Sequence, residues 1–288
     1  MSEVVEQAVK AYQAWMRDNL ARAADHFALT LTGEPVWGWE WRSISTRAHG
    51  ALGACWLRVG CEWEADLDST TADLWTGNED SNAIVGVTKP RVLSSTQWTA
   101  HTEPERRIRA DVMTLLAGTP CSPTDVLRAD LHLPDTWWAE LRRSLDAVRV
   151  VPTTRFALRG GRTDRRVREY FGLDMPAREH QTGHGDLHWN NLFGPTFGLL
   201  DWEMWGVVPV GSDPAYLHAC SLLAPETARR VYYTFADVLN SPAGRIAQVR
   251  AAARLLHHAG NKVPGLVESI RKHVQPILDQ TAKESAEP

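Results

Sequence analysis

The sequence predicts an α+β fold of two lobes, an antiparallel sheet lobe followed by a mostly helical lobe. Alternation of aromatic and polar residues at period two is found in the first 120 residues, and it is typical of half-buried strands. After Pro123 the apolar residues recur at helical spacing instead. Between the two patterns, the segment Gly118–Pro123 is rich in glycine and proline, as boundaries between domains are.

The first lobe is expected to begin with an amphipathic helix over Val4–Phe27. Its apolar residues, from Val5 to Leu20, recur at helical spacing, and Gly33 and Pro35 lie beyond its end. Two strands then follow with glycines between them, which predicts an antiparallel hairpin. The remaining pattern predicts an interrupted helix and two short strands. The expected elements after the first helix are strands 37–46 and 55–61, helix 63–84, and strands 90–96 and 109–116.

The second lobe is expected to consist mainly of helices and to end in a polar tail. The helices are predicted over residues 126–131, 137–150, 162–171, 214–223, 225–239, 246–258 and 263–282. The predicted domain organisation is therefore an N-terminal lobe over 1–118, a helical lobe over 119–282 and a disordered tail over 283–288.

Composition and charge exclude several classes of function. The chain has 288 residues, a formal net charge of -4 and a pI near 6.3, which argue against a nucleic-acid-binding surface. The four cysteines form no C-x-x-C pair and are too few for a disulfide scaffold. The N-terminus does not resemble a signal peptide, and no apolar run approaches the roughly 18 residues of a membrane span. A cytoplasmic protein, monomeric or homodimeric, with no nucleic-acid or membrane partner is expected.

Three polar residues have the spacing of a phosphoryl-transfer site. Kinases orient the acceptor hydroxyl with an aspartate in a D-x-x-x-x-N loop and bind metal ions through that asparagine and a later aspartate. Asp186 and Asn191 have this spacing, and Asp201 follows ten residues after Asn191. The residues between them predict two short strands joined by Gly194-Pro195, and such a hairpin would bring Asn191 and Asp201 to the same side. Both could then reach one Mg²⁺.

The segment His184-Gly185-Asp186 with Asn191, followed by Leu200-Asp201-Trp202-Glu203, resembles the aminoglycoside phosphotransferase family, small-molecule kinases related to protein kinases. The resemblance spans roughly residues 33–225. It includes Gly211-Ser212-Asp213-Pro214, similar to a G-D-P segment, the strand Gly86–Leu93, and Val112–Pro120, similar to the hinge whose backbone binds adenine.

The resemblance implies a protein-kinase-like fold and a role for each matching residue. Asp186 would be the catalytic carboxylate, Asn191 and Asp201 would hold Mg²⁺, and His184 would support the loop. In the hinge, Met113 and Leu115 would contact the adenine of ATP, or of a related nucleotide such as GTP. Arg58 occupies the position of the lysine that contacts phosphate, with Lys89 as the competing candidate. Its acidic partner would be Asp73, or else Glu64 or Glu79, while only Gly33 and Gly38 stand where a glycine-rich loop is expected.

The acceptor is expected to be a hydroxyl-bearing small molecule. The resemblance favours an antibiotic-inactivating kinase, acting on an aminoglycoside or another basic antibiotic such as a cyclic peptide; an amino alcohol or a sugar is the metabolic alternative. Candidate acceptor contacts are His188 and the carboxylates Glu169, Asp174 and Glu203. Arginines alternate with the carboxylates between 162 and 179, so the preference for a cationic acceptor is weakly indicated.

Two other classes of function compete with a kinase. His180, His184 and His188 recur every four residues, and on a helix they would share one face, as metal ligands of a hydrolase do. Gly183 and Gly185 argue against a helix there, and no H-E-x-x-H motif is present. The poor glycine loop and Arg58 in place of lysine suggest instead a non-catalytic pseudokinase, although all three of Asp186, Asn191 and Asp201 are retained.

Overall fold

The computed structural model describes residues 3–51, 53–67, 72–157, 162–259 and 262–286. The chain forms two compact units. The sheet unit comprises Met1–Asn82 and Pro90–Leu116, and the helical unit comprises Ala83–Lys89 and Ala117–Pro288. The segment Ala83–Lys89 thus belongs to the helical unit although it lies within the first 118 residues. Among the described helices, none is both long and apolar enough to cross a membrane.

The sheet unit is built on a six-stranded antiparallel sheet. The strands run in the order β1-β3-β4-β6-β5, and β2 also pairs with β3. Their bounds are β1 Thr30–Leu31, β2 Val36–Trp37, β3 Ser43–Gly50, β4 Gly53–Trp63, β5 Val92–Ala100 and β6 Arg106–Met113. β3 and β4 form the hairpin that the sequence predicted.

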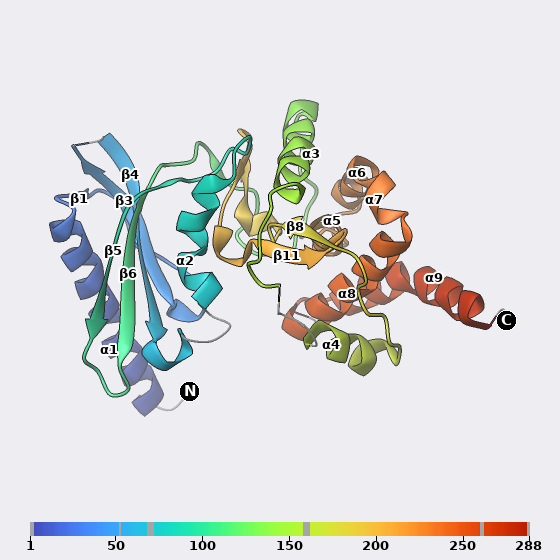
Figure 1. Cartoon of the computed structure of the whole chain (residues 1–288), viewed down its shortest axis with the longest axis horizontal. Helices are drawn as coiled ribbons and strands as arrows, with labels where there is room; N and C mark the ends of the chain where they lie inside the picture. Colours follow the sequence, from blue (N-terminus) through green and yellow to red (C-terminus); the bar gives the residue numbers. More distant parts are fainter. Residues whose placement is uncertain (1–2, 52, 68–71, 158–161, 260–261, 287–288) are drawn as a thin grey trace. The chain divides into compact units, whose positions relative to one another are not determined.

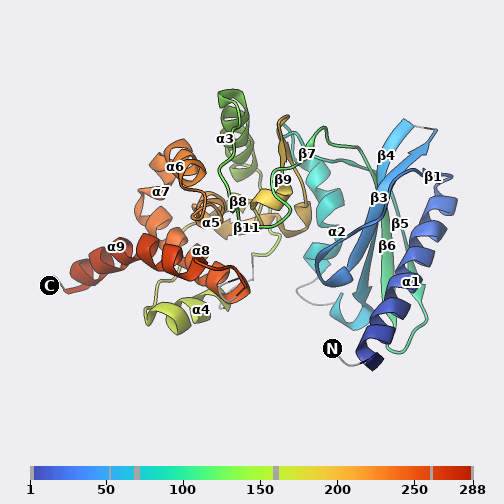
Figure 2. The same ribbon diagram turned by 180° about the vertical axis from the view of Figure 1, so that it is seen from behind.

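Helices α1 (Glu3–His26) and α2 (Ala72–Asp80) cover opposite faces of this sheet (Figures 1 and 2). Side chains alternate across a strand, so every second residue of β4 and β6 points toward α1. That face is apolar: Leu57, Val59 and Ile108 are fully buried with Met16 of α1. The intervening residues, Arg58 among them, belong to the opposite, more polar face.

In the sheet unit, one predicted strand and one predicted helix are interrupted in the structure. The alternating run from Trp37 to Thr46 is not one strand, because a 3-10 turn over Trp39–Trp41 interrupts it. Glu40 and Trp41 have positive φ angles of 51° and 57°, which a continuous strand does not allow. The helix expected over 63–84 extends only over α2, after a 3-10 turn at Glu64–Asp66, and residues 68–71 lie outside the described part.

The helical unit contains seven helices and five short strands in its described residues. The helices are α3 Asp135–Arg149, α4 Arg162–Phe171, α5 Ser212–Ala219, α6 Pro225–Thr234, α7 Ala236–Leu239, α8 Pro242–Ala259 and α9 Leu266–Ala286. The strands are β7 Thr119–Pro120, β8 His180–Gly183, β9 Leu192–Gly194, β10 Gly198–Leu199 and β11 Gly206–Pro209. Its core includes Trp137, Trp189 and Trp202, which are almost completely buried.

Three expectations for the helical unit differ from the structure. The helix expected over 225–239 is divided at Phe235 into α6 and α7. Val126–Leu131 forms bends and not a helix, although Val126 and Leu127 are buried. Asp130 in this segment accepts the backbone N–H of Thr227 (2.8 Å), which fastens the bend to α6. The last helix continues to Ala286, into the segment 283–288 that was expected to be a disordered tail, and residues 287–288 lie outside the described part.

Candidate active site

The loop that carries Asp186 begins where β8 ends. β8 pairs with β11, and the chain then turns at Gly185, whose φ of +80° is readily available only to glycine. A Cβ at this position would also collide with the carbonyl oxygen of Met204. Asp213 of α5 holds the loop in place, because its carboxylate accepts hydrogen bonds from the backbone N–H groups of His184 (2.7 Å) and Gly185 (2.9 Å).

The Asp186 carboxylate lies among cationic and polar groups. Its Oδ1 is ion-paired with Nη2 of Arg254 on α8, and its Oδ2 lies 3.4 Å from Nε2 of His188. Burial alone would raise the pKa of Asp186, but the charge of Arg254 and the contact with His188 outweigh it. The net result is a pKa well below the ordinary value of an aspartate. Asp186 is therefore ionised at neutral pH and can accept a hydrogen bond from a hydroxyl group.

Asn191 and Asp201 are brought together by the β9–β10 hairpin. Leu199 pairs with Leu192, and the N–H of Leu200 donates to the carbonyl of Asn191 (2.8 Å), so Asp201 follows directly after the residue opposite Asn191. Asp201 is exposed and adopts a left-handed conformation (φ 61°, ψ 73°). Trp189 precedes this hairpin in the sequence and Trp202 follows it, and both side chains are buried in the core. Their burial fixes the backbone next to Asn191 and Asp201.

The donor set of Asn191 and Asp201 fits a divalent cation. The Nδ2 of Asn191 contacts the carbonyl of Asp186 (3.0 Å) and Nε2 of His188 (3.2 Å), so its amide oxygen is the atom that can face a cation. An amide oxygen and a carboxylate are oxygen ligands of the kind Mg²⁺ prefers, and Mg²⁺ is commonly held by one or two protein oxygens together with phosphate groups. In the described residues, no group of three His, Cys, Asp or Glu side chains is suited to hold a metal.

The two histidines of the loop are structural neighbours of Asp186. His184 is fully buried, its Nε2 lies 2.9 Å from the carbonyl of Leu200, and its ring packs edge-on against Trp202. His188, an expected acceptor contact, is 7% exposed and has Nδ1 3.6 Å from a carboxylate oxygen of Asp125. Burial lowers the pKa of His188, but the nearby carboxylates, first that of Asp186, raise it above the ordinary value.

The rival metal-hydrolase interpretation required a helix through His180, His184 and His188. Residues His180–Gly183 form strand β8 instead, and the chain turns at Gly185. The three imidazoles therefore do not share a helical face, and the geometry on which that interpretation depended is not formed.

The residues expected to bind the nucleotide are distributed over both units. Arg58 lies in the middle of β4, directly opposite Asp111 of β6. Met113 is the last residue of β6 and is buried, and Leu115 follows it at the end of the sheet unit. Lys89 belongs to the helical unit; it is buried, and its Nζ lies 5.4 Å from the centre of the Trp202 ring.

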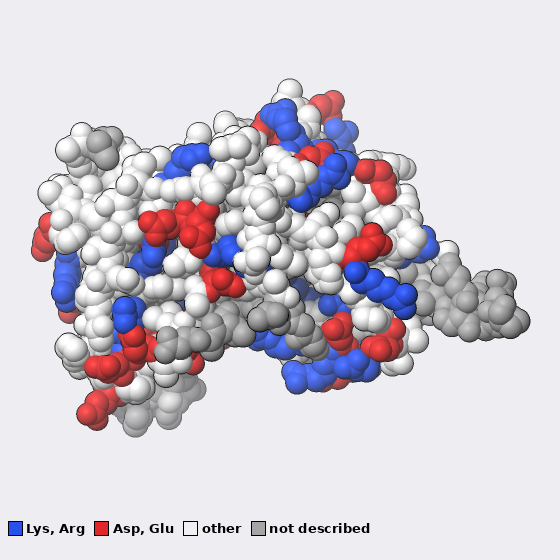
Figure 3. All heavy atoms as spheres, viewed as in Figure 1, with Lys and Arg blue, Asp and Glu red and all other residues white. Residues whose placement is uncertain are grey.

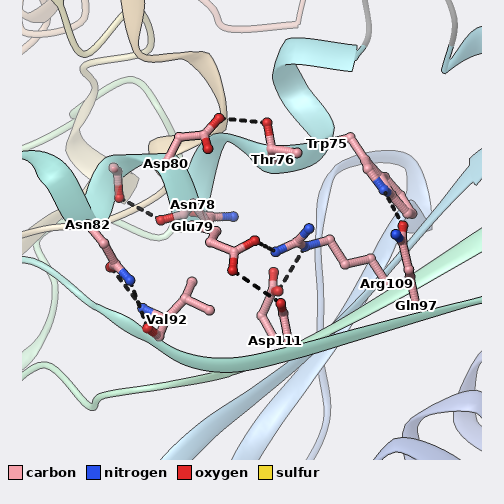
Figure 4. A network of polar contacts seen from close by, with 12 residues as sticks. Trp75, Thr76, Asn78, Glu79, Asp80, Asn82, Val92, Gln97, Arg109 and Asp111 are labelled. Atoms are coloured by element: carbon pink, nitrogen blue, oxygen red, sulfur yellow. Dashed lines mark hydrogen bonds and ion pairs between the residues drawn. The ribbon is translucent and has the colours of Figure 1, made fainter.

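Glu79, one of the two less favoured acidic candidates, is a carboxylate of α2 that contacts an arginine of the sheet. Figure 4 shows Glu79 bound to Arg109 (2.6 Å), which also donates to Asp111 (2.8 Å). Burial raises the pKa of Asp111, against the effect of the guanidinium groups of Arg109 and Arg58. Asp73 lies in the first turn of α2. The third candidate, Glu64, follows β4 and is ion-paired with Arg107.

Two of the three carboxylates expected to bind a cationic acceptor are ion-paired with arginines. Glu169 is ion-paired with Arg165 (3.5 Å) on α4, and Asp174 with Arg168 (2.8 Å). Glu203 lies in the 3-10 turn Trp202–Met204, next to Asp201.

Sequence reasoning missed Arg254, Asp125 and Arg109. For Arg254 a signal was present, because it is a charged residue within the apolar run Ala251–Leu256 of a helix. Arg109 stands two residues before Asp111 on the same strand, and therefore on the same face. Asp125 lies immediately before the segment 126–131 that was expected to be a helix, and it gave no comparable signal.

Comparisons with known proteins agree with this geometry at the level of the fold. No family model and no curated protein matches the sequence. The structure is similar to the aminoglycoside phosphotransferase APH(4)-Ia, with a TM-score of 0.57 and 12% identity over 92% of this chain and 98% of that one. It is also similar to an amicoumacin kinase (TM-score 0.51, 11% identity, 92% and 93% covered) and to a microcompartment-associated aminopropanol kinase (0.51, 12%, 89% and 92%). The fold is thus the α+β, two-lobed fold of these small-molecule kinases, which confirms the predicted fold class and the structural side of the predicted resemblance.

Proposed function

We propose that this protein transfers the γ-phosphoryl group of ATP to a hydroxyl group of a small molecule. The observation that carries the proposal is the β9–β10 hairpin, which joins Asn191 to the residue before Asp201 and sets both beside the Asp186 loop. A carboxylate next to two oxygen ligands for a cation is the arrangement that phosphoryl transfer requires.

Each residue of this arrangement has a definite task in the proposed reaction. Asp186, ionised beside Arg254, accepts the proton or hydrogen bond of the acceptor hydroxyl and orients its oxygen. Asn191 and Asp201 hold Mg²⁺, which when bound neutralises charge on the phosphates. Asp213 keeps the loop in place through two backbone N–H groups. Arg58 in the sheet unit and Lys89 in the helical unit remain alternative cations for the phosphates.

Two classes of acceptor are consistent with the fold. The similarity to an aminoglycoside phosphotransferase and an amicoumacin kinase supports an antibiotic-inactivating enzyme, and the similarity to an aminopropanol kinase supports a metabolic one. A similar structure of APH(4)-Ia, with a TM-score of 0.54, was determined with AMP-PNP and hygromycin B, which supports a nucleoside triphosphate as the donor. A pseudokinase would bind the nucleotide and transfer nothing.

The test is ATP consumption by the purified full chain against a panel of hydroxyl-bearing antibiotics and metabolites, with and without Mg²⁺. Turnover that requires Mg²⁺ is expected. It should fall by about 10²- to 10⁴-fold in Asp186→Asn, because this is the usual contribution of a group that accepts the proton. Asp135→Asn, an exposed α3 residue paired with Arg230, is the matched control and should leave kcat unchanged. Turnover that persists in Asp186→Asn contradicts the assigned role, and ATP binding without transfer to any acceptor supports the pseudokinase.

A further inference from the structure

Helices α4 and α8, which pack against each other, carry Arg166 and Arg254, and Arg254 contacts the catalytic loop. The contact is anchored by Val167 of α4 and Ala253 of α8, which are fully buried in one small apolar cluster. Arg166 immediately precedes Val167, and Arg254 immediately follows Ala253. Arg254 pairs with the Asp186 carboxylate, donates to the carbonyl of Gly185 (3.0 Å) and stacks over the ring of Tyr216 (4.1 Å).

Three carboxylates of this region are already paired with other arginines. Besides the pairs of Glu169 with Arg165 and of Asp174 with Arg168, Asp164 of α4 is ion-paired with Arg250 of α8. Arg250 also donates to the carbonyl of Met175 (3.2 Å). Three of the four carboxylates between 162 and 179, those of Asp164, Glu169 and Asp174, are thus ion-paired within the protein. Figure 3 shows the resulting mixture of arginines and carboxylates over α4.

Arg166 differs from its neighbours in having no such compensation. Its Nε is buried, and within the described part of the chain it has no hydrogen-bond partner. Burial, together with the positive charges of Arg254, Arg162 and Arg165, lowers the pKa of Arg166. The packing of α4 against α8 thus brings two arginines within electrostatic reach of each other, and among the described residues a carboxylate pairs with Arg254 but none pairs with Arg166.

An imidazole on the same helix senses both arginines. His258 of α8 is one helical turn beyond Arg254, and burial together with the charges of Arg166 and Arg254 lowers its pKa to about 4. The Asp186 carboxylate acts on the same imidazole in the opposite direction, so this histidine lies within electrostatic reach of the catalytic loop. His258 is therefore neutral at neutral pH, and the positive charge around it comes from the two arginines.

From this arrangement we propose that Arg166 and Arg254 form an anion-binding subsite beside Asp186, and that the phosphorylated acceptor is a hydroxyl compound carrying a carboxylate or a phosphate ester. The inference rests on the proposed function and narrows its substrate class. A carboxylate or phosphate supplies the counter-charge that Arg166 lacks, and the planar guanidinium group pairs with either through two parallel hydrogen bonds. A polycationic acceptor would instead add to the repulsion between Arg166 and Arg254.

The experiment compares acceptors that differ only in charge. The pairs are glycerate with glycerol, gluconate with glucose, and glucose 6-phosphate with glucose, and kanamycin is the polycationic member. For at least one pair, kcat/KM of the anionic compound should exceed that of its neutral partner by about ten-fold or more, as a charge-assisted hydrogen bond provides. Arg166→Gln should remove that preference. Arg168→Gln, two positions along the same helix and paired with Asp174, should retain it.

A direct measurement does not depend on choosing the right acceptor. Binding of inorganic phosphate and of citrate, measured by calorimetry without nucleotide at constant ionic strength, should weaken at least ten-fold in Arg166→Gln and remain unchanged in Arg168→Gln. Equal affinity in all three proteins overturns the subsite, as does turnover restricted to neutral or cationic acceptors. Those outcomes leave the kinase proposal intact, whereas it fails separately if the protein neither binds ATP nor consumes it with any acceptor.

Discussion

The Asp213 carboxylate offers the sharpest test of how the catalytic loop is held. It is 5% exposed, and its two oxygens each accept one backbone N–H of the loop, from His184 and from Gly185. Replacement by asparagine preserves the shape but converts one acceptor into an NH₂ donor. One backbone N–H then loses its acceptor, and the new NH₂ group faces that donor.

The expected cost follows from those two unsatisfied groups. A buried polar group without a partner costs about 1–3 kcal/mol, so Asp213→Asn should lower the free energy of unfolding of the helical unit by about 2–6 kcal/mol. That is a large part of the roughly 5–15 kcal/mol by which a domain is usually stable. Asp237→Asn is the control, because Asp237 is exposed and paired with Arg142, and such a pair contributes about 1 kcal/mol or less.

The assay is urea denaturation of the wild type and both variants at one temperature, followed by tryptophan fluorescence. Trp137, Trp189 and Trp202 are buried in the helical unit and report on its unfolding. A loss in Asp213→Asn that lies within about 1 kcal/mol of the loss in Asp237→Asn would refute the reasoning. The same variant should lower kcat in any acceptor assay, because the Asp186 loop is displaced.

Three further predictions concern other parts of the molecule. Gly185→Ala should destabilise the protein by about 1–2 kcal/mol from the left-handed backbone alone, with a further cost from the collision with Met204, and an unchanged melting temperature would contradict this. Burial lowers the pKa of His218 to about 3, whereas its pKa in the unfolded state is about 6.5, so between these values only the unfolded state binds the proton. The free energy of unfolding should therefore fall by about 2 kcal/mol between pH 7 and pH 5. Denaturation curves of His218→Phe should show a weaker dependence on pH. Glu79→Ala should speed amide hydrogen exchange in α2 by about five-fold, because the contact with Arg109 is worth about 1 kcal/mol, and unaltered exchange would show that the contact does not hold the helix.

Helices were predictable where an apolar stripe recurs along the chain. The helix over 162–171 coincides with α4, and the first helix agrees with α1 to within a residue at either end. The run Val126–Leu131 shows why periodicity alone is insufficient. Its apolar residues are buried in the core, but the chain reaches them through bends that Asp130 fastens to α6, a contact across 97 positions of sequence.

The candidate site was predictable where its geometry is local. Asp186, Asn191 and Asp201 lie within 16 positions, and the glycine and proline between the last two indicate a hairpin from the sequence alone. Arg254 is 68 positions from Asp186, and only the packing of α8 against α5 and α4 brings it there. The contact of Glu79 with Arg109 depends on the orientation of a short helix on the sheet, which a spacing rule cannot supply.

The contacts that hold α1 and α2 on the two faces of the sheet differ in polarity. Removing α1 would expose a continuous apolar surface to water, at about 25 cal/mol for each Å². Several contacts between α2 and the strands join polar groups instead: Glu79 pairs with Arg109, and Trp75 donates to Gln97 (Figure 4). Ser95 of β5 also donates to Glu79. Water can replace such contacts one for one, so displacement of α2 carries a smaller solvation cost. The sheet unit therefore holds its two helices by contacts of different kinds, apolar packing for α1 and polar pairs for part of α2.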